Sequence, residues 1–380
     1  MNEPVNSWEY FENEPAPCPQ QSVNGQVISE IEGYLHKATM NDIPGAAILI
    51  AHKGQVIMKQ SFGHLQIVPD KIKNRIDTIY DIASLTKVVA TWPAIIDLIH
   101  KSRIQLDAPI RSYLHEYERC PLGAVTVSQL LTHSGGLPAR TFLKQYGHSK
   151  PMIREGIGNE PFEYAPGSQV LYSNRGFVVL GEIVERVSGS SLGAYLQHNI
   201  WSLLKMKDTM FQPAPHLIDR IAATEYRETE QTCQRGSVHD ENAAILNGVA
   251  GHAGLFSTIS DLANFCAAVM AGGRFHGRQV LGRELIRQSI MNQTDRLNEA
   301  RGYGWAIYER SNFDKIVGHY GFTGTSIMLC PALNQVIILL TNRVHPSREN
   351  TSIRAIRSFI HEKLEGNCSL AYPLQPESQS

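Results

Sequence analysis

The sequence predicts an α+β fold, in which one antiparallel sheet is built from both ends of the chain and is flanked by helices. Near the start, GAAILIAHKGQVIMKQSFG contains two β-rich runs on either side of His52-Lys53-Gly54, which is typical of a hairpin. Near the end, four β-rich runs follow one another: YGWAIYER, IVGHYG, TSIMLC and QVIILLTN. The pattern between them is mainly helical. A mostly helical lobe is therefore expected at about 84–255, inserted between the sheet-forming segments.

The helices are predicted from apolar spacing and from capping signals. Apolar residues recur at helical spacing over 23–40, and a second such pattern starts at Ser84 and continues to about 99. The segment STISDLANFCAAVMAGG begins with a capping signal, Ser257-Thr258, and ends with two glycines, so a helix is expected between them. A final helix is predicted over roughly 349–364.

The two ends of the chain differ in composition from the rest. Residues 1–22 are rich in Pro, Asn and Glu and predict a flexible or draped arm. Residues 365–380 form a tail rich in Pro and Ser. Residues 23–364 are therefore expected to form a single domain.

Charge and hydropathy exclude several classes of protein. The formal net charge of the 380 residues is −1, so no strong field points to nucleic acid or to a membrane surface. No segment approaches the roughly 18 consecutive apolar residues of a membrane-spanning helix. The N-terminus has neither the basic nor the apolar region of a signal peptide, and a cytoplasmic location is expected. The alternative is an exported protein whose signal has been removed from the sequence.

The spacing of cysteines and histidines predicts no metal site. The six cysteines are scattered and form no C-x-x-C pair, so reduced thiols are expected rather than a zinc cage. His239, Asp240, Glu241 and His252 have ligand chemistry, but consecutive residues do not place their side chains on one face, and no H-x-x-x-H pair accompanies them. Structural or substrate-rim roles are expected for these four. We expect no metal and no organic cofactor.

Ser84 and Lys87 form the first candidate catalytic pair. In Ser84-Leu85-Thr86-Lys87 the hydroxyl and the amine lie one helical turn apart on one face. A serine becomes a nucleophile when a base takes its proton, and a desolvated lysine can be that base because burial favours the neutral amine. The backbone N–H of Ser84 at the helix N-terminus could then face an oxyanion. A serine N-cap followed by a surface lysine would have the same spacing.

The second candidate element is Tyr172-Ser173-Asn174, in a predicted turn after YAPGSQV. A phenol near a cation can pass a proton between nucleophile and leaving group. The Asn174 amide could hold a substrate amide or orient the lysine. A buried tyrosine followed by a turn asparagine is the alternative interpretation.

The third candidate element is IVGHYGFTGTS, a β segment interrupted by glycines. Gly321 and Gly324 would let a substrate backbone approach the strand closely. The N–H of Phe322 could be a second oxyanion donor, and His319 could contact a substrate carboxylate or the Tyr172 hydroxyl. An edge strand with a surface histidine is the alternative interpretation.

Together these motifs resemble those of the serine β-lactamase and penicillin-binding-protein-like hydrolases, especially the branch of class C β-lactamases, D-alanyl-D-alanine carboxypeptidases and related esterases. The resemblance extends from about residue 33 to 360. It rests on YDIASLTKVVAT, LLTHSGGLP, YAPGSQVLYSN, GVAGHAGLFSTISDLANF, GHYGFTGTS and LLTNRVHP, in that order. The segment VHDENAAILNGVAGHAGLFST is similar to a sub-branch that includes carboxypeptidases and amidases of cell-wall peptides. The resemblance implies a β-lactamase/transpeptidase-like fold and makes 23–364 the catalytic domain.

The resemblance also implies roles for the residues of the first two motifs. Ser84 matches the acylated serine and Lys87 the motif lysine. Tyr172 matches the general acid/base, and Asn174 matches the third member of that motif.

In the third motif, His319 stands where relatives have lysine or histidine, and Gly321 matches the family glycine. Tyr320 departs from the pattern, because relatives usually have threonine or serine there. The phenol is expected to remove a donor to a substrate carboxylate and to fill the space beside it. Thr323-Gly324-Thr325 is a second possible register, which would place Phe322 in the cationic position.

The sequence therefore predicts a serine hydrolase that acts through a covalent acyl-enzyme on a small ester, an amide or a D-amino-acid peptide. An acyltransferase on the same fold and a non-catalytic ligand-binding protein are the alternatives. The expected partner is a small-molecule or short-peptide substrate, and the sequence does not indicate an oligomeric state.

Overall fold

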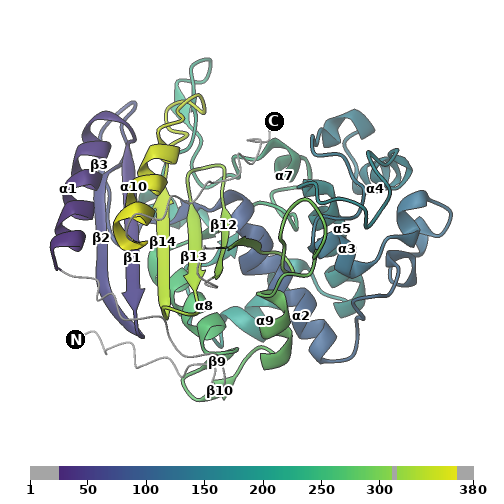
Figure 1. The fold of residues 1–380 in the computed structure, drawn as a ribbon. Helices are drawn as coiled ribbons and strands as arrows, with labels where there is room; N and C mark the ends of the chain where they lie inside the picture. Colours follow the sequence, from purple (N-terminus) through teal and green to yellow (C-terminus); the bar gives the residue numbers. More distant parts are fainter. Residues whose placement is uncertain (1–24, 310–314, 366–380) are drawn as a thin grey trace.

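A computed structural model describes residues 25–309 and 315–365 of the chain. The predicted arm at 1–22 lies outside these residues, and so does the predicted tail except Glu365, which ends a helix. Within the described residues, a sheet with helices on both faces adjoins a mostly helical lobe (Figure 1). The predicted α+β architecture is confirmed.

Seven strands form the main sheet of the described chain, and every neighbouring pair is antiparallel. From one edge to the other they are β11 (Ala306–Glu309), β12 (Lys315–Tyr320), β13 (Ser326–Cys330), β14 (Gln335–Thr341), β1 (Gly45–His52), β2 (Gln55–Gln66) and β3 (Ile72–Lys73). The register of β1 with β14 runs from Ala46↔Thr341 to His52↔Gln335. The two ends of the chain thus meet in the middle of the sheet, as predicted.

Successive residues of the central strands β1 and β14 alternate between two hydrophobic cores, as the period of two requires. Ile48 of β1 packs toward α1 (Gly25–Asn41) and α10 (Ile353–Glu365), which cover one face of the sheet (Figure 1). Leu49, the next residue, faces the larger core of the lobe. Because α8 (Ile259–Met270) contacts both β1 and β14, it covers this second face.

The hairpin between β1 and β2 is the one predicted from the sequence. Lys53 and Gly54 form its two-residue turn, with φ of 50° and 77°. Positive φ at both positions is the requirement of a type I′ turn, whose twist matches that of the strands.

The lobe, between β3 and β11, consists of short helices and small sheets of two or three strands. Its α-helices are α2 (Trp92–His100), α3 (Val127–Leu131), α4 (Lys150–Asn159), α5 (Asn174–Ser188), α6 (Leu192–Leu196), α7 (Glu241–Ile245) and α9 (Arg283–Ser289), in addition to α8. Its strands are β4 (Tyr80–Asp81), β5 (Met210–Phe211), β6 (Tyr226–Arg227), β7 (Thr232–Cys233), β8 (Leu255–Ser257), β9 (Arg274–Phe275) and β10 (Arg278–Gln279). Thr258 caps α8 by accepting a hydrogen bond from the Asp261 N–H, as the capping signal predicts.

The single helix expected from Ser84 to about 99 is instead three segments. A 3₁₀ turn at Ala83–Leu85 and a π turn at Lys87–Thr91 precede α2. Pro93 lies in the first turn of α2 and has no N–H for the carbonyl one turn earlier, which widens the preceding turn. The Val89 carbonyl accepts a hydrogen bond from the Trp201 indole at 3.2 Å instead. Lys87 thereby sits at the start of a wide turn.

No helix in the described part of the chain has both the length and the apolar character needed to cross a membrane. Cys120, Cys233 and Cys266 are free thiols.

Candidate active site

Ser84 lies on a strained turn that leads from β4 into the lobe. Ala83, just before it, has φ of 47°, a left-handed conformation that is costly for a residue with a side chain. The Asp81 carboxylate holds this turn, because its Oδ1 accepts a hydrogen bond from the Ala83 N–H at 2.8 Å. Ser84 keeps partial exposure while Ala83 and Leu85 are buried. The turn therefore presents the Ser84 hydroxyl at the surface of the lobe.

The segment after β12 clamps this turn against the main sheet. The Thr323 hydroxyl donates to the Asp81 carbonyl at 2.7 Å, and the Thr325 hydroxyl donates to the Ile82 carbonyl at 3.0 Å. A Cβ at Gly321 would lie 2.1 Å from Thr325 Oγ1 and 2.6 Å from Ile82 O, so glycine is required by close approach. Both threonines are buried and used in this packing.

Lys87 is fully buried behind Ser84. Its Nζ donates to the His252 carbonyl at 3.2 Å and lies 4.8 Å from the centroid of the Tyr172 ring. Burial lowers the pKa of Lys87 to about 7; the Asp240 carboxylate opposes this effect, and the Arg301 guanidinium adds to it. The amine can therefore be neutral near neutral pH, as a general base must be.

Tyr172 connects the nucleophile to the lysine. Its phenol lies close enough to the Ser84 side chain for Ser84 to lower the pKa of the phenol. Burial raises the pKa of Tyr172 above the usual range, although the Ser84 side chain and the Arg301 charge oppose that effect. The phenol is therefore protonated at neutral pH and needs a partner base before it can accept a proton.

His133 holds Tyr172 from both sides. The Leu171 N–H donates to the His133 carbonyl at 2.9 Å, and the Ser173 N–H donates to its Nδ1 at 3.2 Å. The imidazole and the Tyr172 ring lie with centroids 4.5 Å apart. His133 is a turn residue with φ of 57°, and it also fixes the backbone that carries the phenol.

Asn174 begins α5, two residues after Tyr172. Its side chain is buried, and Oδ1 has no hydrogen-bond partner within the described residues. Arg175 braces the same helix end, because its guanidinium forms an ion pair with Glu160 at 3.2 Å and donates to the Pro138 carbonyl at 3.1 Å.

His319 projects from β12 on the face toward the lobe, with its ring centroid 6.0 Å from that of Tyr172. Its Nδ1 lies 2.9 Å from the Tyr320 carbonyl and must be the donor, so a neutral ring keeps its lone pair on Nε2. Burial holds the pKa of His319 well below its usual value, and the Lys87 and Arg301 charges act in the same direction. His319 is thus a neutral acceptor rather than a cation.

Tyr320 points away from the lobe, so its phenol does not lie on the face of β12 that carries His319. Successive strand residues point to opposite faces, and Tyr320 packs with the α1–α10 core while His319 faces the lobe. The Arg357 guanidinium lies 4.4 Å from its ring centroid. The expectation that the phenol fills space beside the substrate is therefore wrong.

Phe322 follows Gly321 and stacks on His239, with centroids 5.7 Å apart and planes 20° apart. The backbone N–H of His239 donates to Asp81 Oδ2 at 2.8 Å. The same carboxylate therefore holds the Ser84 turn through one oxygen and the His239 segment through the other.

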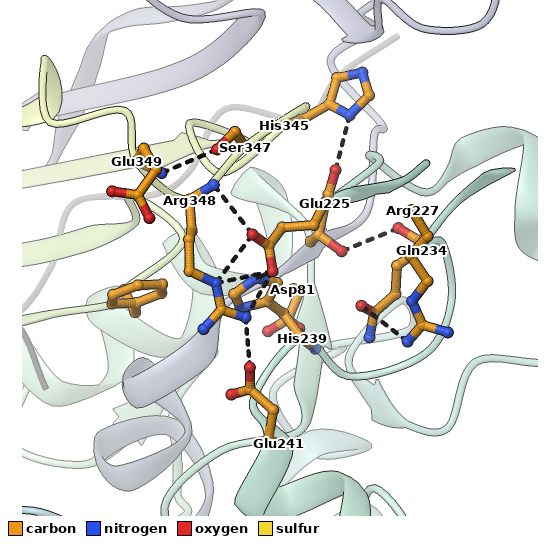
Figure 2. Close-up of polar contacts among 12 residues, drawn as sticks. Asp81, Glu225, Arg227, Gln234, His239, Glu241, His345, Ser347, Arg348 and Glu349 are labelled. Carbon is orange, nitrogen blue, oxygen red and sulfur yellow. Dashed lines mark hydrogen bonds and ion pairs between the residues drawn. The ribbon is translucent and has the colours of Figure 1, made fainter. Parts of the chain in front are cut away.

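An ion-pair network fixes the His239 side chain (Figure 2). Its Nε2 lies 2.9 Å from Glu225 Oε2, and Arg348 bonds the same oxygen at 2.6 Å and also reaches Glu241. Burial would raise the pKa of Glu225, but the hydrogen bonds from His239 and Arg348 outweigh it and hold the pKa below its usual range. The network ties the segment after β14 to the segment before α7.

Asp240 and His252 are site residues that sequence reasoning assigned only to structural or rim roles. Asp240 Oδ1 lies 3.0 Å from His252 Nε2, and the His252 carbonyl is the acceptor for Lys87. The motifs H-D-E and G-H-A-G thus meet around the lysine, a contact that a single sequence cannot show. No group of three His, Cys, Asp or Glu side chains in the described residues is arranged to hold a metal ion.

Arg301 is a further site residue that the sequence did not indicate. Its guanidinium carbon lies 5.8 Å from the Tyr172 ring centroid, and the side chain is 1% exposed. The structure thus brings together Ser84, Lys87, Tyr172 and His319, with Arg301 and Asp240 as flanking charges.

Comparisons with known proteins show the family and the fold of the chain. The family model described as Beta-lactamase matches residues 31–359. A protein of Escherichia coli O157:H7 named "Putative D-alanyl-D-alanine carboxypeptidase" is 27% identical over 364 residues, covering 85% of this chain and 83% of its own. The N-acetylmuramyl-L-alanine amidase of Bacillus subtilis strain 168 is 26% identical over 361 residues, covering 84% and 81%. The solved structure of EstCE1, a hydrolase with promiscuous acyltransferase activity, has a TM-score of 0.71 at 20% identity and covers 91% of this chain and 100% of its own.

Proposed function

This chain belongs to the beta-lactamase family of serine hydrolases, and on that premise we propose that Ser84 is the residue it acylates. The observation that carries the proposal is the grouping of three side chains: Ser84 acts on the phenol of Tyr172, and the centroid of the Tyr172 ring lies 4.8 Å from a buried Lys87 amine. A pKa of about 7 allows that amine to be neutral at the pH where it must act.

In acylation, Ser84 Oγ attacks the substrate carbonyl carbon and loses its proton to the Tyr172 oxygen. The phenol passes its own proton to the Lys87 amine in the same step, so Tyr172 stays neutral and Lys87 becomes the ammonium. When the C–N or C–O bond to the leaving group breaks, Lys87 returns the proton by the same route. A water molecule then repeats the sequence at the acyl carbonyl and releases the acid.

The backbone N–H groups of Ser84 and Phe322 are the proposed oxyanion donors. Ser84 belongs to the first turn of a helical segment, where N–H groups have no partner inside the helix. The Phe322 backbone is kept beside the Ser84 turn by the Gly321 contact and by the stack with His239. Fixed donors of this kind stabilise the charge that develops on the substrate oxygen.

The proposed substrate is a short peptide or a related amide with a D-amino acid, as in the names of the carboxypeptidase and amidase relatives. His319 is a neutral acceptor, which suits a substrate N–H better than a carboxylate. A leaving group that carries an N–H beside the scissile bond would be accepted, and simple esters should also react.

Covalent labelling tests the proposal. The protein is incubated with a fluorophosphonate, and the intact mass is measured for wild type, Ser84→Ala and Ser190→Ala, an exposed serine that serves as the matched control. One adduct is expected on wild type and on Ser190→Ala and none on Ser84→Ala. Turnover of a chromogenic acetyl ester should follow the same pattern, and labelling of Ser84→Ala would refute the assignment.

Adding amines or alcohols to the ester assay tests which molecule receives the acyl group from the acyl-enzyme. Release of the free acid as the main product supports hydrolysis, whereas transfer of the acyl group to the added nucleophile would make the protein an acyltransferase. Absence of both labelling and turnover would favour a ligand-binding protein.

A further inference from the structure

Arg301 lies at the end of the loop between α9 and β11, and hydrogen bonds within the loop hold its backbone. Thr294 Oγ1 accepts a hydrogen bond from the Arg301 N–H at 2.9 Å and donates to the Glu299 carbonyl at 2.7 Å. The Gln293 N–H donates to the Arg301 carbonyl at 2.7 Å. These contacts fix both the loop and the direction in which the arginine leaves it.

The same loop is fastened to the segment that carries Tyr172. Asn298 Oδ1 accepts from the Val170 N–H at 2.7 Å, and Asn298 Nδ2 donates to the Val170 carbonyl at 3.0 Å. Val170 is two residues before Tyr172. The arginine and the phenol are therefore fixed relative to each other by backbone contacts and not only by their own side chains.

The Arg301 guanidinium is buried beside Tyr172 with few partners. Its Nη2 forms an ion pair with Glu299 Oε1 at 2.7 Å, while Nε and Nη1 have no hydrogen-bond partner within the described residues. A guanidinium keeps its charge, and a buried charge with incomplete pairing destabilises a fold. An arginine kept in such a place is expected to serve the site rather than the core.

The other groups around Lys87 do not supply a permanent positive charge. Burial holds the pKa values of His133 and His319 well below their usual range, so both rings are neutral. Five charged or titratable side chains act on Lys87 or contact it, and they come from different elements of the fold. They are Tyr172, Asp240, His133, His319 and Arg301. Arg301 is the fixed cation in this set and Asp240 is the carboxylate.

We propose that Arg301 is a positioning residue that acts as the fixed cation of the active site: its charge keeps the Lys87 amine neutral and stabilises the partial negative charge that the Tyr172 oxygen carries while its two protons are in transfer. Asp240 acts on the lysine in the opposite direction. This rests on the proposed function, in which Lys87 is the base and Ser84 the nucleophile.

The pH dependence of kcat/KM for a neutral acetyl ester tests the proposal. Arg301→Met removes a positive charge near Lys87, so the pKa of Lys87 should rise. The acid limb, which is the fall of kcat/KM at low pH, should therefore move to higher pH by about 0.5–1 unit. Arg301→Lys keeps the charge, and its acid limb should stay near that of wild type. Asp240→Asn removes the opposing negative charge, and its limb should move to lower pH.

A purely structural role for Arg301 predicts a different outcome. The plateau would fall, but the acid limb would stay in place. Arg154→Met is the matched control, because this substitution also removes a buried or half-buried arginine charge. The ion pairs that it breaks, with Glu116 and Glu182, lie away from the proposed proton path. This control should lower the melting temperature without moving the limb. An unmoved limb in Arg301→Met, or equal movement in Arg301→Lys, would overturn the proposal.

A second variant keeps the test decisive if Arg301→Met does not fold. Glu299→Gln leaves Arg301 in place but without its neutralising carboxylate, so the acid limb should move to lower pH. Movement to higher pH, or none, would count against Arg301 as the cation. The pH dependence of fluorophosphonate labelling gives the same readout without turnover. If Ser84→Ala is still labelled, the proposed function fails; if Ser84 alone is labelled and no limb moves, only the role of Arg301 fails.

Discussion

The side-chain amine of Lys87 donates a hydrogen bond to the backbone carbonyl of His252, 3.2 Å away. A carbonyl acceptor suits a neutral amine as well as an ammonium and adds no full negative charge. The nearest compensating carboxylate, Asp240, is itself bonded to the His252 ring. The protein thus surrounds its proposed base with dipoles rather than with a direct ion pair, and the consequences for pH, stability and rate can be measured.

The acid side of the pH profile should report Lys87. Burial lowers the pKa of Lys87 to about 7, so the amine is protonated and inactive as a base below that pH. We expect kcat/KM for a neutral ester to fall about tenfold per pH unit below about pH 6.5 and to level off above about pH 7.5. A profile that stays flat down to pH 5 would contradict the assignment of Lys87 as the base.

Lys87→Met should stabilise the fold while abolishing activity. The pKa of Lys87 is lower in the folded protein than in the unfolded chain, so the unfolded chain binds the proton more tightly. This cost is fully present below about pH 7 and disappears as the pH rises toward 10. At pH 7 it amounts to about 4 kcal/mol at most, of which the variant should regain part.

Urea unfolding of Lys87→Met and wild type at pH 7 and pH 10 measures this effect. The advantage of the variant should be largest at pH 7 and should shrink by pH 10. Lys73→Met, at an exposed position on β3, is the control and should show no such pH-dependent gain. A variant less stable than wild type at both pH values would contradict the prediction.

Tyr172→Phe and Lys87→Ala should not be additive. Each change interrupts the same proton path, so each should lower kcat for an ester by about 10²–10⁴-fold, and the double variant should be little worse than the worse single one. Single-turnover acylation rates for the four proteins form the required cycle. If the rate loss of the double variant equals the product of the two single losses, Tyr172 and Lys87 act in separate steps and not in one proton path.

His133 should be replaceable by asparagine but not by leucine. Asparagine tolerates the left-handed conformation at this position, and its Oδ1 can accept the Ser173 N–H in place of Nδ1. Leucine cannot accept, so Tyr172 should shift, and kcat should fall about 10–100-fold with KM much less affected. Comparable losses in both variants would mean that the hydrogen bond to Ser173 does not position the phenol.

Gly321→Ala should disable the site through the backbone. The new methyl group would lie 2.6 Å from the Ile82 carbonyl, so the turn that carries Ser84 must move. We expect kcat/KM to fall by about 10²-fold or more, with about 1–3 kcal/mol lost in stability. Gly33→Ala is the matched control, because nothing lies within 4 Å of its Cβ in α1. An active Gly321→Ala protein would contradict the close approach.

The fold and the core of the site could be predicted because their signals are local. β-rich runs at both ends of the chain predict the sheet, and the motifs around Ser84 and Tyr172 indicate the residues that the structure brings together. Their catalytic roles remain predictions. The orientation of Tyr320 was within reach of sequence reasoning as well, since consecutive residues of a strand face opposite sides.

The contacts of Lys87 could not be predicted in the same way. The contact between Lys87 and His252 joins positions far apart in the sequence, and Arg301 reaches Tyr172 only through a loop fastened at Val170. The irregular start of the helix also depends on a tertiary contact, because the Val89 carbonyl freed by Pro93 needs the Trp201 indole. Periodicity in one sequence carries no information about such partners.

The pairing of β1 with β14 sets the order in which the protein can mature on the ribosome. β1 leaves the ribosome early, but one of its edges has no neighbour until β14, close to the end of the chain, has been synthesised. The strand that bears His319 and the glycine that abuts the Ser84 turn also arrive only then. A nascent chain is therefore both inactive and exposed at an open strand edge for most of its synthesis. The proposed site is therefore incomplete until β12, β13 and β14 have joined the sheet.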